Sequence, residues 1–486
     1  MLGTKINGLH CFWYVLWIFT IHHLLGLSAL QAQTLACRLS DREIIRKANL
    51  LQAATRGDRT AQIQYNQLVQ LHAERLRQCR QSYWPRTQAV WLRVYPCDLK
   101  PGQLDQVLDN IANFGYNRIY LSTFYDGRVL LPKRDNPTVW PSVVESHANN
   151  TDLLAQAIAK SHSRGIAVYA WLFSMNFGPS YAKRADRKGA IARNGYGETN
   201  LQDPAGIPDD GRAAHIYVDP YSTQARADLG LLVQQVAQRR PDGIVFDYIR
   251  YPHRAESVVS DVRDLMIYGS SSASTLLTRA ISQRGQDLIY RYMQKGQVTA
   301  QATDAERPLW YLPDEVQPQR QAIKLGSNLK SINRELWRLS VTHARRGVIE
   351  FLDSVSIPVH QLGIATGAVF FPRANLNSSR GVDPRLQPWH QFKNVSEWAP
   401  MTYAICGSAD CLIDELALVI QQAHGSQKIC PVIAGYWGRG DAGRLSLEDQ
   451  MYALRGAYPQ LNCISHFAYA WFDLDGDRQR RSCRLD

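Results

Sequence analysis

The residue best placed to do chemistry is Asp247, a carboxylate at the end of a short apolar stretch. Residues 244–246 are Ile, Val and Phe, so the stretch 241–252 reads as a buried strand that ends at Asp247 and continues into a loop. In a parallel α/β barrel, catalytic groups sit at that end of the strands. Asp247 is therefore a candidate acid, base or nucleophile. The alternative is an aspartate that pairs with Arg250 and only pins the loop.

The first 36 of the 486 residues differ in composition from the remainder. Lys5 precedes an apolar run at 11–21, and small residues follow through Ala29, Ala32 and Ala36. This order predicts a secretory signal peptide and a secreted or periplasmic protein. An uncleaved membrane anchor is the alternative, because the apolar run approaches the length that spans a bilayer.

The cysteines agree with export. Removing the signal with Cys11 leaves eight of the nine cysteines, an even number that predicts disulfides in an oxidising compartment. Two helical patterns, at about 41–56 and 58–80, would form an antiparallel hairpin within 37–85. That hairpin would bring its two end cysteines together as a Cys37–Cys79 bond. The next pairs are Cys406 with Cys411, which bracket a short turn, and Cys430 with Cys463, which open two apolar runs.

From residue 88 onward, short apolar runs alternate with amphipathic helical patterns. Helices are expected at 103–114, 152–164 and 410–424, each followed by or ending beside a glycine. Eight repeated βα units predict a (β/α)8 barrel of the α/β class over 88–486. Long excursions are expected at about 174–219 and, as a helical insertion after the fourth strand, at about 253–335. The eight apolar runs are 89–95, 117–124, 166–173, 243–249, 362–371, 395–404, 429–437 and 464–472.

Aromatic residues are concentrated at and just beyond the ends of the expected strands. Aromatic faces stack on sugar rings, so this pattern favours a carbohydrate groove, although about half of such residues are expected to be ordinary core. Trp437, Trp389 and Tyr403 are the preferred groove residues, because polar or glycine residues adjoin them.

The chain resembles the family 10-like glycosyl hydrolases, which are secreted bacterial barrel proteins. The resemblance implies hydrolysis of a bacterial polysaccharide, with peptidoglycan glycan strands as one substrate class. The family often has a second aspartate after the strand-4 aspartate, where this chain has Tyr248. The matching stretches follow the family order across most of the chain: Trp140-Pro141, 151–172, Val218-Asp-Pro220 to Arg226, 242–252 and Pro400-Met-Thr-Tyr403.

Glycoside hydrolysis normally uses two carboxyl groups, whose separation decides between retention and inversion of configuration. The preferred partner of Asp247 is Asp473, because it also follows an apolar run, here the eighth. A glutamate after the seventh strand is missing, since residues 435–438 read Gly-Tyr-Trp-Gly. Glu397 begins the sixth strand and is expected to be structural. The other candidates for the second carboxylate are Asp219, Asp126 and Asp441.

The remaining site predictions concern substrate contacts. Arg93, Arg250 and Tyr403 are expected to position the substrate. Further contacts are expected from Asp126, Trp171, Asp219, Tyr251 and Trp437. The rival hypothesis is a noncatalytic glycan-binding or scaffold protein that keeps the barrel and the aromatic groove but lacks one carboxylate.

No cofactor, metal or nucleic acid is expected. Residues 438–443 fit G-x-G-x-x-G but lie late in a barrel, and the acidic stretch from 473 lacks the glycine and glutamate of a calcium loop. The net charge of +12 is spread along the chain without a nucleic-acid-binding signature. The expected partner is a polysaccharide.

Overall fold

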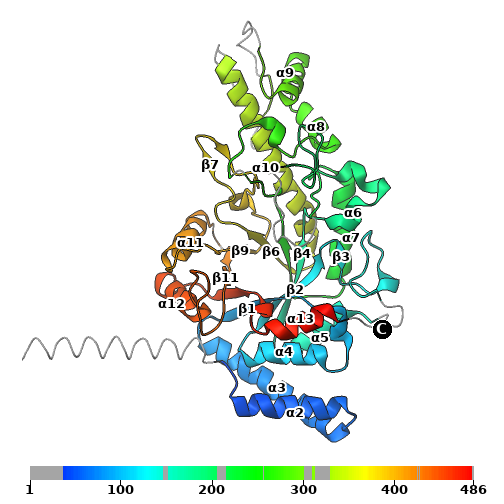
Figure 1. Ribbon diagram of the computed structural model, residues 1–486, viewed down its shortest axis with the longest axis vertical. Coiled ribbons are helices and arrows are strands. Elements are labelled where there is room, and N and C mark those ends of the chain that lie inside the picture. The colour runs from blue at the N-terminus through cyan, green and yellow to red at the C-terminus, as the bar shows by residue number, and fades with distance from the viewer. Residues whose placement is uncertain are drawn as a thin grey trace, which may run out of the picture.

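The computed structural model describes residues 37–145, 151–204, 215–255, 257–299, 309–311, 329–423, 425 and 427–483. Its centre is a parallel sheet with the order β10-β9-β6-β5-β4-β2-β1-β12-β11 (Figure 1). A short strand, β3 (Arg128–Val129), pairs antiparallel with the end of β2. The main strands are β1 (Thr87–Leu92), β2 (Arg118–Tyr125), β4 (Ala167–Phe173), β5 (Gly243–Asp247), β6 (Ala365–Phe370), β9 (Glu397–Pro400), β10 (Lys428–Ile429), β11 (Val432–Ala434) and β12 (Cys463–Phe467).

The two ends of this path belong to one interrupted strand. β10 pairs with β9 and β11 pairs with β12, and only Cys430 and Pro431 separate them. Proline has no N–H to donate, which breaks the ladder locally. The Cys430 N–H still donates to the Trp398 carbonyl (2.8 Å), and the Pro431 carbonyl accepts from the Ser465 N–H (2.9 Å). The sheet therefore closes into an eight-stranded barrel, which confirms the predicted (β/α)8 fold.

Helices cover the outside of the barrel. Gly115 follows α4 (Gln103–Asn113) and Gly165 follows α5 (Leu153–His162), with φ of +80° and +70°, the left-handed conformation that their predicted role as helix terminators requires. The connection from β6 to β9 differs from the expected βα pattern: it holds a hairpin, β7 (Asn377–Ser378) and β8 (Gly381–Val382), and no α-helix. The helices that follow barrel strands are α4 (Gln103–Asn113), α5 (Leu153–His162), α7 (Thr223–Ala237), α10 (Leu329–Gln361), α11 (Asp410–Gln422), α12 (Leu447–Ala457) and α13 (Leu474–Ser482).

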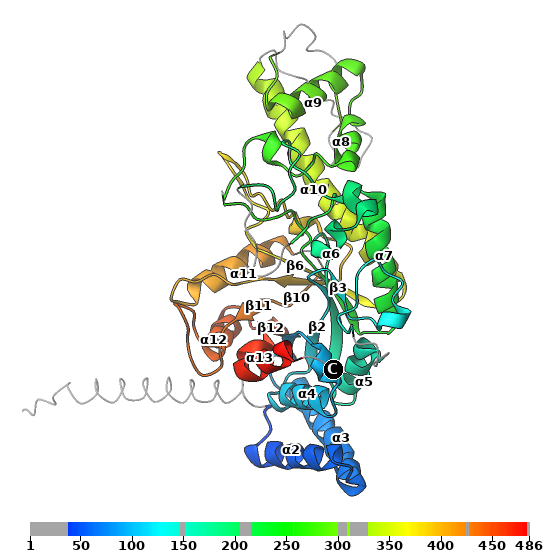
Figure 2. The same cartoon turned by 45° about the vertical axis from the view of Figure 1, so that its right-hand side comes forward.

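The excursions after β4 and β5 build an extension beyond the carboxyl ends of the strands. It holds α6 (Gly178–Ala182), α8 (Ser270–Leu277), α9 (Gln283–Lys295) and the first part of α10, which rise above the barrel in Figures 1 and 2. Asp219 anchors this extension: it accepts from the Ser272 N–H (2.8 Å) and hydroxyl (2.5 Å) at the start of α8.

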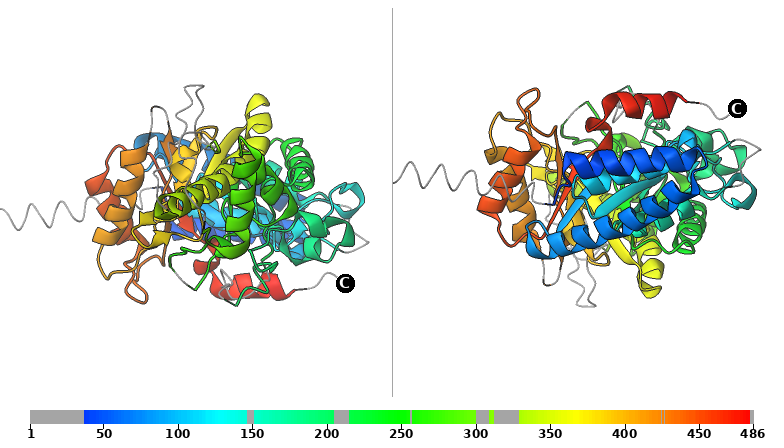
Figure 3. Two further views of the ribbon diagram at one scale, coloured as in Figure 1. Left: turned by 90° about the horizontal axis from the view of Figure 1, so that it is seen from above. Right: turned by 90° about the horizontal axis from the view of Figure 1, so that it is seen from below.

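The N-terminal hairpin lies at the opposite end of the barrel. Its helices α2 (Asp41–Thr55) and α3 (Arg59–Ser82) run antiparallel across the underside, as the blue pair in Figure 3 shows. Ser40 and Asp58 cap the two helices through side-chain hydrogen bonds. The Arg80 side chain donates to the carbonyls of Gly115 (2.7 Å) and Pro85 (3.2 Å), so α3 is held directly against the barrel.

Four disulfides are present in the described part of the chain. Cys37–Cys79 closes the helical hairpin, and Cys406–Cys411 closes the turn before α11, both as expected. Cys430–Cys463 links the break between β10 and β11 to the start of β12. The fourth bond, Cys97–Cys483, joins the segment after β1 to the residue that follows α13, across 386 residues. No local pattern predicts a bond of that span.

The predicted signal peptide, residues 1–36, lies outside the described residues. Among the residues that the structure does describe, no helix has both the length and the apolar character needed to cross a bilayer.

Candidate active site

Asp247 is the last residue of β5, and the structure fixes its carboxylate firmly. All five residues of β5 are buried, and Gly243 is required at its start because an added Cβ would lie 2.5 Å from the Tyr169 ring. The Trp171 Nε1–H donates to Asp247 Oδ2 (3.0 Å) and the Tyr248 N–H donates to Oδ1 (2.6 Å). Asp247 keeps 8% of its surface exposed. The orientation of this carboxylate is therefore set by two neighbouring strands.

Aromatic rings surround this carboxylate. Tyr248, with φ of +53°, packs against Phe173 at 4.2 Å between ring centroids. Phe467, at the end of β12, lies 6.2 Å from the Trp171 ring and 6.0 Å from the Tyr403 ring. Burial, and next the negative charge of Asp247, raise the pKa of the Tyr403 hydroxyl well above its usual value. Tyr403 therefore stays protonated near neutral pH and can donate a hydrogen bond beside Asp247.

Arg250, in the loop after β5, extends this cluster. It is buried, and its Nη1 donates to the Tyr217 hydroxyl (3.1 Å) and to the Tyr251 carbonyl (3.1 Å). Its guanidinium also lies 4.9 Å above the Tyr248 ring. The buried His215 packs edge-on against Tyr248 at 5.2 Å. Sequence reasoning missed His215 and Tyr217, although both immediately precede the Val218-Asp-Pro220 stretch that it singled out.

Arg93 and Asp126 form a second, more open group after β1 and β2. Arg93 Nη1 lies 3.8 Å from Asp126 Oδ2, and their side chains are 28% and 31% exposed. The Arg93 guanidinium stacks on the Tyr125 ring at 4.3 Å. Asp126 has a φ of +51°, so the turn after β2 turns sharply at this residue. The structure therefore brings these two predicted site residues together.

Two predicted substrate contacts are enclosed instead. Asp219 is fully buried and its two oxygens accept from Ser272 and from the Tyr221 N–H (3.0 Å). Tyr251 retains 1% exposure, and its N–H donates to the Arg385 carbonyl (2.9 Å). A substrate cannot reach either side chain, because Asp219 and Tyr251 are both enclosed by the segments that cover this end of the barrel.

Asp473 lies at the surface after β12, where it caps α13. Its Oδ1 accepts from the Gly476 N–H (2.9 Å), and the residue is exposed. It lines a pocket of about 510 Å³, together with Tyr469. The opposite wall of this pocket is α4, which contributes Asn110. None of its described contacts is shared with Asp247. Asp441, another candidate, is exposed in a tight turn with Arg444.

Trp437 and Trp389 lie away from Asp247: Trp437 is half-buried and lines a separate pocket of about 290 Å³ with Tyr436 and Trp471, and Trp389 is buried. Trp437 packs on the outside of β12: its Nε1–H donates to the Tyr116 hydroxyl (3.0 Å), and its ring lies 5.2 Å from that of His466. Trp389 has 1% exposure and stacks on Phe370 at 4.7 Å. An adjoining polar or glycine residue does not indicate on which side of the barrel wall an aromatic ring lies.

The Trp437 contact belongs to a buried hydrogen-bond chain that ends at His466. Because Tyr116 accepts from Trp437, its own proton can go to His466 Nδ1, which requires a neutral imidazole. Burial, and next the charges of Arg80 and Arg38, lower the pKa of His466 to about 3. Acidification should therefore weaken this part of the fold.

We expect His466 by itself to lower the free energy of unfolding by about 2 kcal/mol when the pH falls from 7 to 5. Below the unfolded pKa of about 6.5 the unfolded chain binds the proton and the folded chain does not, so stability decreases as pH falls towards 3. His466→Asn keeps an acceptor for Tyr116 but cannot titrate. Urea unfolding at both pH values should show a smaller loss in this variant; equal losses would contradict the assignment.

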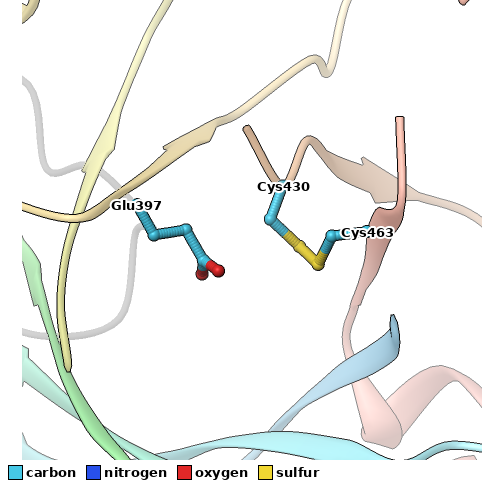
Figure 4. Close-up of side chains that lie close together, drawn as sticks. All are labelled: Glu397, Cys430 and Cys463. Carbon is cyan, nitrogen blue, oxygen red and sulfur yellow. A yellow bond between two sulfur atoms is a disulfide. The ribbon is translucent and has the colours of Figure 1, made fainter. Parts of the chain in front are cut away.

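One cluster of potential metal-binding side chains occurs in the described residues: Glu397, Cys430 and Cys463, with ligand atoms within 4.8 Å of one another (Figure 4). The two sulfurs form a disulfide and offer no thiolate. The Glu397 oxygens accept from Arg118 Nη1 (2.7 Å) and from the Tyr120 hydroxyl (2.6 Å). Glu397 is thus a buried structural residue at the amino end of the barrel, as its position in the sequence predicted.

Comparison with known proteins gives likeness at the level of fold. No family model matches the chain, and no curated protein does. The PgaB (BpsB) glycoside hydrolase domain from Bordetella bronchiseptica is similar, with 15% identity and a TM-score of 0.49, over 82% of this chain and 99% of that one. The spore cortex-lytic enzyme SleL of Bacillus megaterium QM B1551 has 9% identity and a TM-score of 0.37, over 82% of this chain and 74% of the other.

A GH20 exo-β-N-acetylglucosaminidase from Vibrio harveyi has 11% identity and a TM-score of 0.40, over 79% of this chain and half (50%) of the other. At these identities and scores the likeness supports no conclusion about activity. Membership of the family 10-like glycosyl hydrolases stays a prediction, because no family model matches.

Proposed function

We propose that the protein is an exported glycoside hydrolase that acts on a cell-envelope or extracellular polysaccharide, with Asp247 as a catalytic carboxylate. The observation that carries this proposal is the setting of Asp247: it ends a barrel strand, two N–H donors fix it, and aromatic rings surround it. Peptidoglycan glycan strands are one candidate substrate, which the family resemblance suggests.

The reaction needs one group that protonates the leaving glycosidic oxygen and one that attacks the anomeric carbon or activates water for that attack. Asp247 supplies one of these groups. The second is proposed among two aspartates after barrel strands: Asp473, the exposed, sequence-based choice, and Asp126, which is partly exposed. The Tyr403 hydroxyl supplies a donor that orients sugar hydroxyls, the buried Arg250 holds the Tyr248 ring beside Asp247, and Arg93 holds Asp126.

A noncatalytic glycan-binding protein is the second candidate function. The observation in its favour is that Asp473 caps α13 and shares no described contact with Asp247. In that case the barrel and its aromatic rings would bind a glycan without cleaving it.

The test measures new reducing ends when the purified protein is incubated with peptidoglycan sacculi and with soluble acidic and neutral polysaccharides. The hydrolase proposal expects products from at least one of these glycans, and none from the Asp247→Asn variant. Equal retention of both proteins on a glycan, without reducing ends from either, would establish the binding function instead.

A further inference from the structure

A pocket of about 510 Å³ lies outside the barrel, between α10 and the β7–β8 hairpin. Both walls extend from the carboxyl ends of barrel strands, since α10 belongs to the excursion after β5 and the hairpin follows β6. The pocket therefore lies on the same side of the molecule as the Asp247 end of the barrel. Figure 1 shows its two walls, α10 and the hairpin that begins with β7, side by side above the sheet. The volume of the pocket is within the range of ordinary ligand sites.

The lining of this pocket is cationic. It includes the guanidinium groups of Arg338, Arg345 and Arg380, hydroxyl groups such as those of Thr342 and Ser379, and the half-buried ring of Trp337. No aspartate or glutamate is among its described lining residues. Arginines bind carboxylate, sulfate and phosphate groups through paired N–H donors, while the hydroxyls and the indole suit a sugar ring.

The walls of the pocket are held in place by the backbone. Val259, at the start of the insertion, exchanges two hydrogen bonds with Val382 of β8 (2.9 and 3.0 Å). Gly381 allows this approach, because an added Cβ would lie 2.1 Å from the Val259 carbonyl oxygen. Arg345 Nη2 donates to the Asn377 side chain (2.6 Å), which ties α10 to β7. The insertion and the hairpin thus form one built surface.

The positive charge in this pocket is weakly compensated. Arg338 is 60% exposed, and Glu335 on the same helix lies 3.8 Å away, an arrangement that contributes little in water. Within the described residues, no hydrogen bond or ion pair engages the Arg380 guanidinium. The chain as a whole carries a net charge of +12. An anionic ligand would find two available guanidinium groups here.

We infer that this pocket binds the anionic groups of an acidic polysaccharide, and that the substrate is therefore a glycan carrying carboxylate, sulfate or phosphate groups. The inference rests on the proposed function for the statement that the bound glycan is also the substrate. A glycan fits better than other polyanions because the pocket combines its arginines with an indole and hydroxyls on the same side of the barrel as Asp247.

The test is direct binding of the full-length exported protein to polygalacturonate, dextran sulfate and uncharged dextran, with phosphatidylglycerol vesicles and single-stranded DNA as polyanions of other classes. All variants carry Asp247→Asn, so that no probe is cleaved. Arg338→Gln with Arg380→Gln is compared with Arg291→Gln with Lys295→Gln, a charge-matched pair on exposed positions of α9. We expect the pocket variant to bind at least one acidic probe about tenfold or more weakly than the control, and added salt to remove the difference.

Three results would overturn the inference. The pocket and control variants could bind acidic probes equally; dextran could bind as tightly as its sulfated form; or the pocket variant could lose binding to phosphatidylglycerol vesicles or single-stranded DNA while keeping binding to both acidic glycans. Because these readouts need no turnover, they are separable from the hydrolase proposal. The pocket variant could lose binding to the acidic probes while the protein with Asp247 intact cleaves none of the glycans of the hydrolase test. That result would support the pocket and reject the hydrolase proposal.

Discussion

The Asp247→Asn variant is expected to lose polysaccharide hydrolysis by a factor of about 10²–10⁴ or more in kcat, the usual contribution of a positioned acid or base. Asparagine keeps the shape of the side chain but can neither transfer a proton nor attack an anomeric carbon. It also has one oxygen where Asp247 uses two, so either the Trp171 Nε1–H or the Tyr248 N–H would face an amide NH₂. We therefore expect a second, smaller effect, a loss of stability of about 1–3 kcal/mol.

The two effects are separated by measuring kcat and urea unfolding on the same preparations. Asp473→Asn and Asp126→Asn serve as matched carboxylate variants, because both residues follow barrel strands and reach solvent, Asp473 as an exposed residue and Asp126 as a partly exposed one. The one that carries the second catalytic role should also lose activity by about 10²-fold or more, whereas the other should retain it. Full activity in Asp247→Asn, with its folding intact, would end the proposed mechanism.

The sequence predicted the barrel and the position of Asp247 because both depend on local patterns. A run such as Ile244-Val-Phe, buried on both faces, reads as a strand of a parallel sheet wherever it occurs. The end of the run then places the next polar residue on the catalytic face. Trp171 and Tyr403 were reached by the same reasoning, and the structure places both beside Asp247.

The errors have a different origin, because the paths of the loops are not local. Tyr251 lies only four residues beyond Asp247, yet the chain turns back and its N–H bonds to Arg385. Asp219 looked like a free carboxylate, but its partner Ser272 lies 53 residues away in the insertion. Trp437 follows the seventh strand and turns outward onto Tyr116. In each case the deciding contact comes from a segment whose position the strand pattern does not specify.

The attachment of the N-terminal hairpin was equally invisible in the sequence, because it depends on buried charges. Asp109 of α4 accepts from the Tyr65 hydroxyl (2.9 Å) and from Arg164 Nε (2.8 Å), and Lys47 Nζ lies 3.6 Å away. All four residues are almost fully buried. Periodicity would assign such charged positions to the solvent face of their helices. They form instead a polar centre between the hairpin and two barrel helices.

Asp109→Ala is expected to lower the free energy of unfolding by about 3–5 kcal/mol, because it leaves two buried cations without their shared anion. Burial already lowers the pKa of the Lys47 ammonium, with Asp109 opposing that effect. Without Asp109 this pKa should fall further, so the variant should regain stability as pH is raised from 7 towards 10. Lys47→Met in the Asp109→Ala background removes one of the uncompensated charges and should recover a measurable part of the loss. Arg164 would remain paired with Asp105 (2.9 Å) in that double variant.

Urea unfolding of these proteins beside Asp135→Ala, an exposed aspartate in a turn, tests the argument. The control should change stability by no more than about 0.5 kcal/mol. A loss below about 1 kcal/mol in Asp109→Ala would show that the buried charges do not hold the hairpin to the barrel. A loss of the expected size that Lys47→Met leaves unchanged would instead assign the effect to the Tyr65 and Arg164 hydrogen bonds, since these are the contacts of Asp109 that the second substitution does not touch.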